Sequence, residues 1–339
     1  FSFEVIRPEQ PDAPGWEHTP AFGVRGVAII PGTGEYELAT SPVNYDLGDG
    51  VMQSANVSTP AAEPDFAHCV EAVCEELPNL EAASLVVSWF GDDLRCGDCT
   101  VRPKVEQKEV DSPEMPWTSG GIDRSAAEVI VQDDGRPVYG GTPTDAAVIE
   151  AIQALSAAGK AVMYYPFILM DPFKGNELPD PYSDNGFQPD LPWRGRITLS
   201  EAPGRPGSPD GTAQAVSEVD AFFGTATAAD FAVVDGVVSY SGPAEWGLNR
   251  FILHNAELCL AAGGVEAFCI GSEMRGLTQI RGPGNSFPAV ARLRGLATEV
   301  RSLLGPETKL SYAADWSEYF GYAPQDGSND RYFHLDPLW

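Results

Sequence analysis

A mainly apolar run that ends at a glycine, a serine and a glutamate most constrains the fold of this chain. Residues 265–270 have the composition of a buried strand in a parallel sheet, and Gly271, Ser272 and Glu273 follow at once. Side chains just past the carboxyl end of a parallel strand lie where barrel enzymes place their catalytic groups. A glutamate in that position can serve as a general acid or base. The run therefore predicts a parallel α/β fold with Glu273 as a candidate catalytic residue.

Apolar strand-like runs and amphipathic helix-like segments alternate from residue 80 to the C-terminus. The runs that predict strands are 84–90, 128–132, 161–170, 265–270 and 309–314. Helices are expected after a Thr142 cap, across 243–262, and after a Ser286 cap. Such alternation favours βα units, and five of them make a little over half of an eight-unit barrel. We therefore predict an α/β fold with a partial (β/α)8 TIM-barrel-like domain.

The domain organisation follows from where this alternation begins. Residues 1–78 are irregular and rich in Pro and Gly, with short strand-like runs at 26–30 and 36–39, and they are expected to precede the barrel. Residues 79–339 form the barrel domain, incomplete at its C-terminus. Within it, residues 171–211 are an insertion after a strand, of the kind that builds a lid or a binding wall. A disordered insertion is the alternative, but its aromatic residues favour a packed loop.

Charge and hydropathy exclude several classes of function. The chain carries 49 Asp plus Glu against 21 Lys plus Arg, a formal charge of -28, which argues against direct nucleic-acid binding. No run of 18 apolar residues is present, so no transmembrane segment is predicted, and no signal-peptide pattern is visible. No glycine-rich phosphate loop is present either, so no cofactor is predicted. The chain begins at Phe1 and ends at Trp339, and both ends are expected to be cut from a longer protein.

The cysteines and histidines do not form a convincing metal-binding pattern. Cys96 and Cys99 form a CxxC pair, whereas Cys69 and Cys74 are five residues apart in a helix-like stretch and face different sides. A local Cys96–Cys99 disulfide and free thiols both stay open. The four histidines are scattered, so no metal is predicted.

Several stretches of this sequence closely resemble one protein family. They are SLVVSWFGDDLRCGDC (84–99), PVYGGTPTD (137–145), YYPFILMD (164–171), PWRGRIT (192–198), IGSEMRGL (270–277), SYAADWSEYFG (311–321) and YFHLDPLW (332–339). They resemble the TIM-barrel-like domain of gene transfer agent and phage tail hub proteins over roughly residues 79–339. Residues 1–78 are similar, more loosely, to the segment that precedes the barrel in that family.

The resemblance implies a glycoside-hydrolase-like barrel in a tail-tip hub or baseplate protein. Such a virion component assembles in the bacterial cytoplasm, is released in the particle, forms a homotrimer with other tail proteins around it, and contacts the recipient cell surface during host attachment. In related barrel glycosidases the acid/base glutamate follows the fourth strand and the nucleophile follows the seventh. Glu273 matches the first position, and the second carboxylate would lie beyond Trp339.

Other residues near predicted strand ends complete the candidate site. We expect carboxylates and indoles that bind a sugar at Trp89, Asp92, Asp171, Trp193, Asp315, Trp316 and Glu318. Most of these should open onto one common concavity with Glu273. Each also has a structural alternative: the aspartates can cap helices, the tryptophans can be core residues, and Glu273 can pair with Arg275 or another arginine.

Two functions remain open at this point. The first is a structural hub component whose barrel binds or cleaves an envelope glycan. The second is an active retaining glycosidase that acts on a cell-surface or cell-wall polysaccharide. Fold does not decide between them, so the choice depends on the site.

Overall fold

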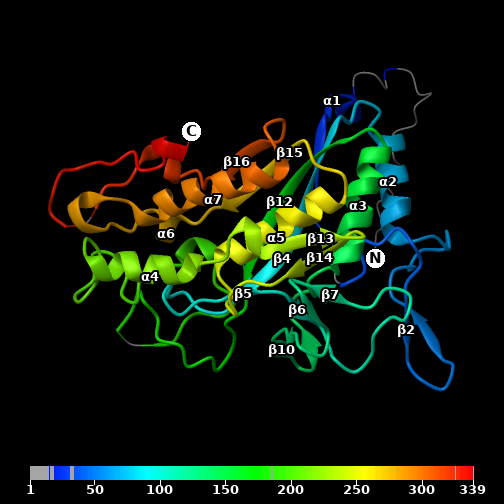
Figure 1. Ribbon diagram of the computed structural model, residues 1–339, viewed down its shortest axis with the longest axis horizontal. Coiled ribbons are helices and arrows are strands. Elements are labelled where there is room, and N and C mark those ends of the chain that lie inside the picture. Colours follow the sequence, from blue (N-terminus) through cyan, green and yellow to red (C-terminus); the bar gives the residue numbers. More distant parts are fainter. Residues whose placement is uncertain (1–14, 16–18, 31–33, 185, 325, 339) are drawn as a thin grey trace, which may run out of the picture.

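The computed structural model describes residues 15, 19–30, 34–184, 186–324 and 326–338. The remaining parts of the N-terminal segment, 1–14, 16–18 and 31–33, lie outside the described residues, as do both chain ends. The centre of the fold is a sheet whose main strands run in the order β1, β4, β12, β15, β16 (Figure 1). They span β1 (Gly26–Ile29), β4 (Ala82–Gly91), β12 (Ala161–Met170), β15 (Ala267–Ser272) and β16 (Lys309–Ala313). All four neighbouring pairs are parallel, which confirms the predicted parallel architecture and partial barrel.

The five strands are not quite the five that the sequence predicted. The run 128–132 is wrong as a sheet strand. It forms only β9 (Glu128–Val129) and β10 (Gln132–Asp133), which pair with short local strands outside the main sheet. This run is too short and too exposed to be a buried strand. The main sheet instead gains β1, from the segment that was expected to precede the barrel. Counted among the parallel strands of this sheet, β15 is therefore still the fourth along the chain. The run 36–39 is also wrong as a strand, because it folds as a buried turn.

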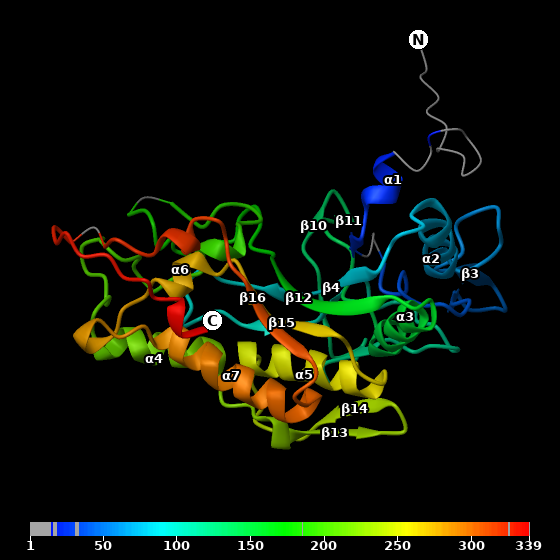
Figure 2. The same cartoon turned by 90° about the horizontal axis from the view of Figure 1, so that it is seen from above.

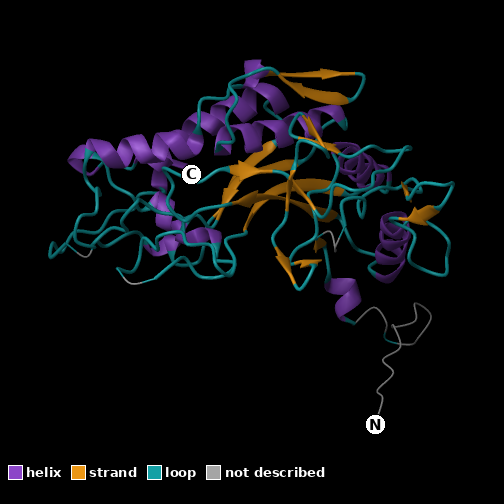
Figure 3. Ribbon diagram, turned by 90° about the horizontal axis from the view of Figure 1, so that it is seen from below, coloured by secondary structure: helices purple, strands orange, loops and turns teal. Residues whose placement is uncertain are grey.

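Three helices cover one side of this sheet. They are α3 (Asp145–Ala157), α5 (Leu248–Ala261) and α7 (Pro288–Leu304), and Figures 2 and 3 show them on the same side of the strands. Each begins slightly later than expected, at the caps Thr144, Gly247 and Phe287. Thr142 does not cap α3, because its hydroxyl donates to the Ser88 carbonyl and accepts from the Lys104 amide.

Shorter helices and strands surround the main sheet and its three helices. The other helices are α1 (Pro20–Gly23), α2 (Asp65–Glu76), α4 (Ala213–Phe223) and α6 (Arg275–Thr278). Short hairpins pair β2 (Asn44–Asp46) with β3 (Met52–Ser54), β7 (Thr118–Ser119) with β8 (Ile122–Asp123), β10 with β11 (Arg136–Pro137), and β13 (Phe231–Val234) with β14 (Val237–Tyr240). Two-residue strands β5 (Val101–Arg102) and β6 (Lys104–Val105) pair with β4 and β9. Single 3-10 turns are η2 (Arg194–Arg196), η3 (Ala228–Asp230), η4 (Pro283–Asn285), η5 (Glu318–Phe320) and η6 (Asp336–Leu338). No helix in the described ranges is long and apolar enough to cross a membrane.

The two faces of the sheet have different environments. Along β12, even-numbered residues such as Tyr164 and Ile168 are buried against the helices, whereas odd-numbered residues are only half-buried. This follows from the two-residue period of a strand. The helix-covered face therefore holds the core, and the other face remains open. In a closed barrel that second face would be the interior, which side chains fill.

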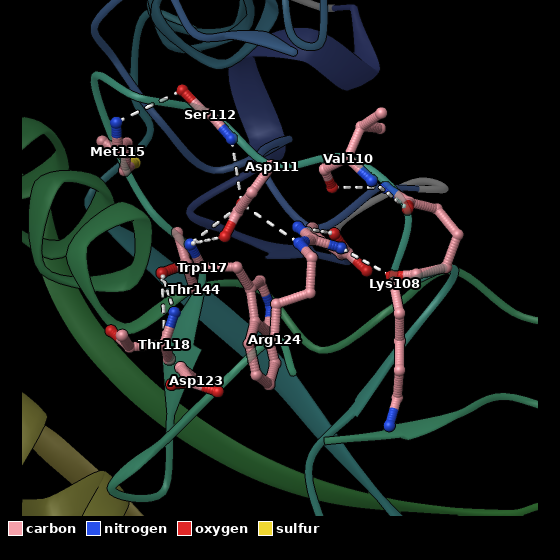
Figure 4. A network of polar contacts seen from close by, with 12 residues as sticks. Lys108, Val110, Asp111, Ser112, Met115, Trp117, Thr118, Asp123, Arg124 and Thr144 are labelled. Atoms are coloured by element: carbon pink, nitrogen blue, oxygen red, sulfur yellow. Dashed lines mark hydrogen bonds and ion pairs between the residues drawn. The ribbon is translucent and has the colours of Figure 1, made fainter. Parts of the chain in front are cut away.

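A buried polar network fastens the N-terminal segment to the excursion between β5 and α3. The Arg124 guanidinium pairs with Glu35 and Asp111, and Asp111 also accepts a hydrogen bond from the Tyr36 hydroxyl. Figure 4 shows Arg124 beside Asp111, which also accepts the amides of Ser112 and Trp117. Burial raises the pKa of Glu35, although the hydrogen bond and charge of Arg124 lower it. Glu35 also accepts the amide of Glu106, whose carboxylate in turn accepts the amide of Gly141. The network thereby fixes the loop just before α3, which forms a wall of the cavity described below.

We expect two leucines of α5 to differ sharply in their contribution to stability. Leu258 is buried in the core and Leu260 is exposed on the same helix. Leu258→Ala should lower the free energy of unfolding by about 2–5 kcal/mol, because it leaves a cavity. Leu260→Ala should change it by no more than about 0.5 kcal/mol. Urea unfolding curves measure both, and equal losses would contradict the assignment of the core to this face.

Candidate functional site

A cavity of about 650 Å³ lies along the open face of the sheet. Its floor is the half-buried side of β4 and β12, and Arg194 and Glu273 lie at its end nearest the carboxyl ends of the strands. Its described lining residues are Ala28, Ile30, Ser84, Val86, Ser88, Val138, Tyr139, Gly140, Gly141, Pro143, Tyr165, Phe167, Leu169, Arg194 and Glu273. A closed barrel would fill most of this apolar floor, so the part that fits a binding site is the end with Arg194 and Glu273.

Glu273 lies directly after β15 in a strained backbone conformation. Its φ is 49°, in the left-handed region that non-glycine residues rarely adopt. Its amide donates to the Ala313 carbonyl at 2.8 Å, and the next amide, of Met274, donates to the Tyr312 hydroxyl at 2.9 Å. Residues of β16 thus hold the turn that carries Glu273. Strain of this kind is typical of functional sites.

Arg194 positions the Glu273 side chain. It comes from η2 in the 171–211 insertion and is only 6% exposed. Its Nε donates to the Ser272 carbonyl at 2.9 Å, and its Nη2 donates to Ser272 Oγ at 2.6 Å and to Glu273 Oε2 at 2.8 Å. The guanidinium also lies over the Phe167 ring, 3.8 Å from its centre. Burial lowers the pKa of Arg194, and the charge of Glu273 opposes that shift. The arginine that pairs with Glu273 is therefore Arg194 rather than the suggested Arg275.

Trp193 makes a second contact with the same carboxylate oxygen. Its indole Nε1 donates to Glu273 Oε2 at 3.2 Å, and the residue is 39% exposed. A side chain on Gly195 would overlap the Trp193 ring. A Cβ on Gly276 would lie 2.6 Å from the Ile197 carbonyl oxygen. Both glycines thus allow the 193–197 segment to pack closely on the turn after β15.

Three candidates at the ends of β4 and β12 do not reach the cavity. Trp89 is 1% exposed and packs on Trp246, Phe251 and His254, because odd-numbered β4 residues face the helices. Asp92 accepts the amide and hydroxyl of Thr100. Asp171 is buried and pairs with Lys104 at 2.7 Å. Burial raises the pKa of Asp171, and Lys104 lowers it.

The candidates after β16 also lie outside the cavity lining. Asp315 accepts the amide and hydroxyl of Ser317, and Trp316 is 74% exposed with its edge against Phe320. Glu318 is buried and accepts hydrogen bonds from Thr278, Tyr312 and the Asp315 amide. Of the candidates expected to share one concavity, only Glu273 lines the cavity among the described residues, and Trp193 contacts Glu273 from outside the lining.

Residues that the sequence analysis did not select form much of the site. Arg194 holds Glu273, and Tyr165, Phe167 and Leu169 form the aromatic and aliphatic floor. The alternation within β12 could have placed these three on one face. Nothing in the sequence indicated which face the helices would leave open.

The cysteines and the other potential metal ligands of the described residues do not form a metal site. All six cysteines are free, and burial raises the pKa of both Cys96 and Cys99. No group of three or more His, Cys, Asp or Glu side chains in the described part of the chain is arranged to hold a metal ion.

Comparisons with known proteins found a family-model match to part of the chain and a distant likeness to solved structures. Residues 246–339 match the family model described as the GTA TIM-barrel-like domain, a narrower match than the resemblance suggested. Two solved structures of GH113 beta-1,4-mannanase are similar to the chain at 12% and 15% identity, with TM-scores of 0.39 and 0.36. The alignments cover 87% and 75% of this chain, and the chain spans only 56% and 51% of those structures. A search of curated protein sequences found no match.

The close packing at Gly195 gives a testable consequence. Gly195→Ala should push the Trp193 ring off Glu273 and lower the free energy of unfolding by about 1–3 kcal/mol, as overpacking does. Gly295, in α7, has open space around it. Gly295→Ala should instead stabilise the protein by about 0.5–1 kcal/mol, because alanine favours the helix. A neutral Gly195→Ala in urea unfolding would contradict the packing described here.

Glu318 gives a second consequence, for the dependence of stability on pH. Burial raises its pKa above the ordinary 4.5, although its hydrogen bonds lower it. The folded state then holds this proton more tightly than the unfolded state, so stability is lost as pH rises from about 4.5 through the raised pKa. Glu318→Gln should remove this loss, whereas Glu71→Gln, on the exposed side of α2, should keep it. Unfolding curves from pH 4 to pH 8 measure the difference, and parallel wild-type and Glu318→Gln profiles would refute it.

Proposed function

We propose that this chain is a glycoside-hydrolase-like barrel module of a hub protein at the tail tip of a gene transfer agent or phage-like particle. We further propose that the end of the cavity at Arg194 and Glu273, called the mouth below, binds a glycan of the recipient cell envelope. The single observation that carries the glycan site is Glu273, held in a strained turn at the carboxyl edge of a parallel sheet beside a half-exposed indole. The match of residues 246–339 to the GTA TIM-barrel-like domain supports the tail context.

The geometry at Glu273 suits a sugar hydroxyl. Trp193 and Arg194 both donate to Oε2, and within the described residues no hydrogen bond reaches Oε1. Oε1 is thus available to accept a hydrogen bond from a ligand, and the side chain of Glu273 is 38% exposed. The exposed part of Trp193 offers a flat apolar face of the type on which ligand rings pack.

Binding takes precedence over cleavage in this proposal. A retaining glycosidase needs two carboxyl groups about 5–5.5 Å apart. The other carboxylates that follow strands are engaged elsewhere, Asp171 with Lys104 and Glu318 with buried hydroxyls. Glu273 remains the candidate acid or base of an active retaining glycosidase, the second function considered. The fourth-strand position of Glu273 favours that alternative, in which the partner carboxylate would lie outside this chain.

The assembly around the module is also part of the proposal. By resemblance, the hub would be a homotrimer with other baseplate proteins as neighbours, assembled in the bacterial cytoplasm and released with the particle. The formal charge of -28 is consistent with a surface that does not bind the packaged nucleic acid.

Binding of envelope glycans by the complete hub protein tests this function. Glu273→Gln and Trp193→Ala should each weaken binding about tenfold or more, because each removes a contact worth on the order of 1–2 kcal/mol. Trp316→Ala changes an exposed tryptophan that packs on Phe320 rather than on Glu273, so it is the matched control and should bind like the wild type. If the protein also cleaves the glycan, Glu273→Gln should lower turnover by about 10²- to 10⁴-fold. Unchanged binding in both Glu273→Gln and Trp193→Ala would exclude this site.

A further inference from the structure

The two charged residues at the Glu273 end of the cavity differ in their accessibility. Among the described residues that line the cavity, Arg194 is the one cation and Glu273 is the one carboxylate. The two differ in accessibility: Arg194 is 6% exposed, whereas the side chain of Glu273 is 38% exposed. A ligand that enters therefore meets the carboxylate before it meets the guanidinium.

Two of the three guanidinium nitrogens of Arg194 are already committed. Nε and Nη2 are bonded to Ser272 and Glu273, and the flat face of the guanidinium lies on Phe167. Nη1 makes none of these hydrogen bonds, so an anionic group that leaves them intact has only this nitrogen of a residue that is 6% exposed.

Two other cations, Lys104 and Arg275, do not supply a replacement. Lys104 is 6% exposed and is paired with Asp171 and Glu128. Arg275 is exposed but does not line the cavity, and its charge helps to lower the pKa of Asp315 against the effect of burial. A carboxylate, sulfate or phosphate on a sugar at the mouth would therefore face Glu273 Oε1, an acceptor, and among the described lining residues would have only Nη1 of the buried Arg194 as a charged donor.

We infer that the mouth selects glycans whose units at this position are uncharged or carry an amino group, and discriminates against acidic sugars. The inference rests on the proposed glycan-binding function and adds a ligand class to it. A neutral hydroxyl or an ammonium group can donate to Oε1, whereas an anionic group would be repelled by Glu273 and by the net negative charge of the chain.

A glycan microarray with the complete hub protein tests the inference. The array holds matched sets in which one backbone appears in neutral, amino and uronic-acid forms, so that only the charge differs. We expect the neutral and amino forms to bind and the matched acidic forms to bind about tenfold more weakly or less, a difference of about 1.4 kcal/mol. The difference should shrink in 1 M salt, where screening is strong.

Two charge variants show whether Glu273 is the cause. Glu273→Gln should bring the ratio of neutral to acidic binding close to one, even though it weakens neutral binding. Glu266→Gln removes the same charge just before the amino end of β15, where Glu266 pairs with Lys309, and should leave the ratio unchanged. An unchanged ratio in Glu273→Gln would overturn the inference.

The array outcomes separate this inference from the function on which it rests. Preferential binding of neutral or amino forms supports both. Acidic forms that bind equally or more tightly overturn the charge selection while leaving glycan binding intact. No binding to any glycan on the array overturns both.

Discussion

The pairing of β4 with β12 is the constraint on which the rest of the structure depends. The two ten-residue strands are hydrogen-bonded in register from Ala82 opposite Ala161 to Gly91 opposite Met170. A shift of one residue would exchange the core face and the cavity face of a strand. The observed register places Trp89 and Ile168 against the helices and leaves Phe167 on the open side, beneath Arg194. The core and the floor of the site are thus two results of the same pairing.

The backbone conformation of the turn after β15 is unfavourable by itself, and contacts from two sides stabilise it. A left-handed conformation at a residue other than glycine costs about 1–2 kcal/mol. Hydrogen bonds from Glu273 and Met274 to β16 hold the backbone, and Arg194 holds the side chain from the insertion. The conformation therefore persists only because β12, its insertion and β16 all converge on it. This convergence supports a site that is built for its chemistry rather than a relaxed surface loop.

The sequence predicted the fold better than it predicted the site, for physical reasons. Long apolar runs such as 84–90 and 161–170 are buried on at least one face in any α/β arrangement, so their assignment to strands was confirmed. The prediction of a sheet strand at 128–132 was wrong, because the hydropathy of a short segment does not show whether neighbouring strands cover it. Glu273 could be placed because it follows its strand directly. Trp89 could not, since its side of the sheet depends on which face the helices cover.

Contacts between distant segments were the least accessible to sequence reasoning, and they decide the chemistry here. Arg194 and Ser272 are 78 positions apart and meet only because the insertion after β12 folds back onto the end of β15. The family match over 246–339 includes Glu273 but neither Trp193 nor Arg194. The carboxylate thus belongs to the matched segment, whereas the two donors that fix its Oε2 come from the insertion. Since Oε2 is occupied by protein donors, any ligand is left with Oε1. The segment after β12 therefore determines which oxygen of Glu273 stays accessible, even though the carboxylate itself follows β15.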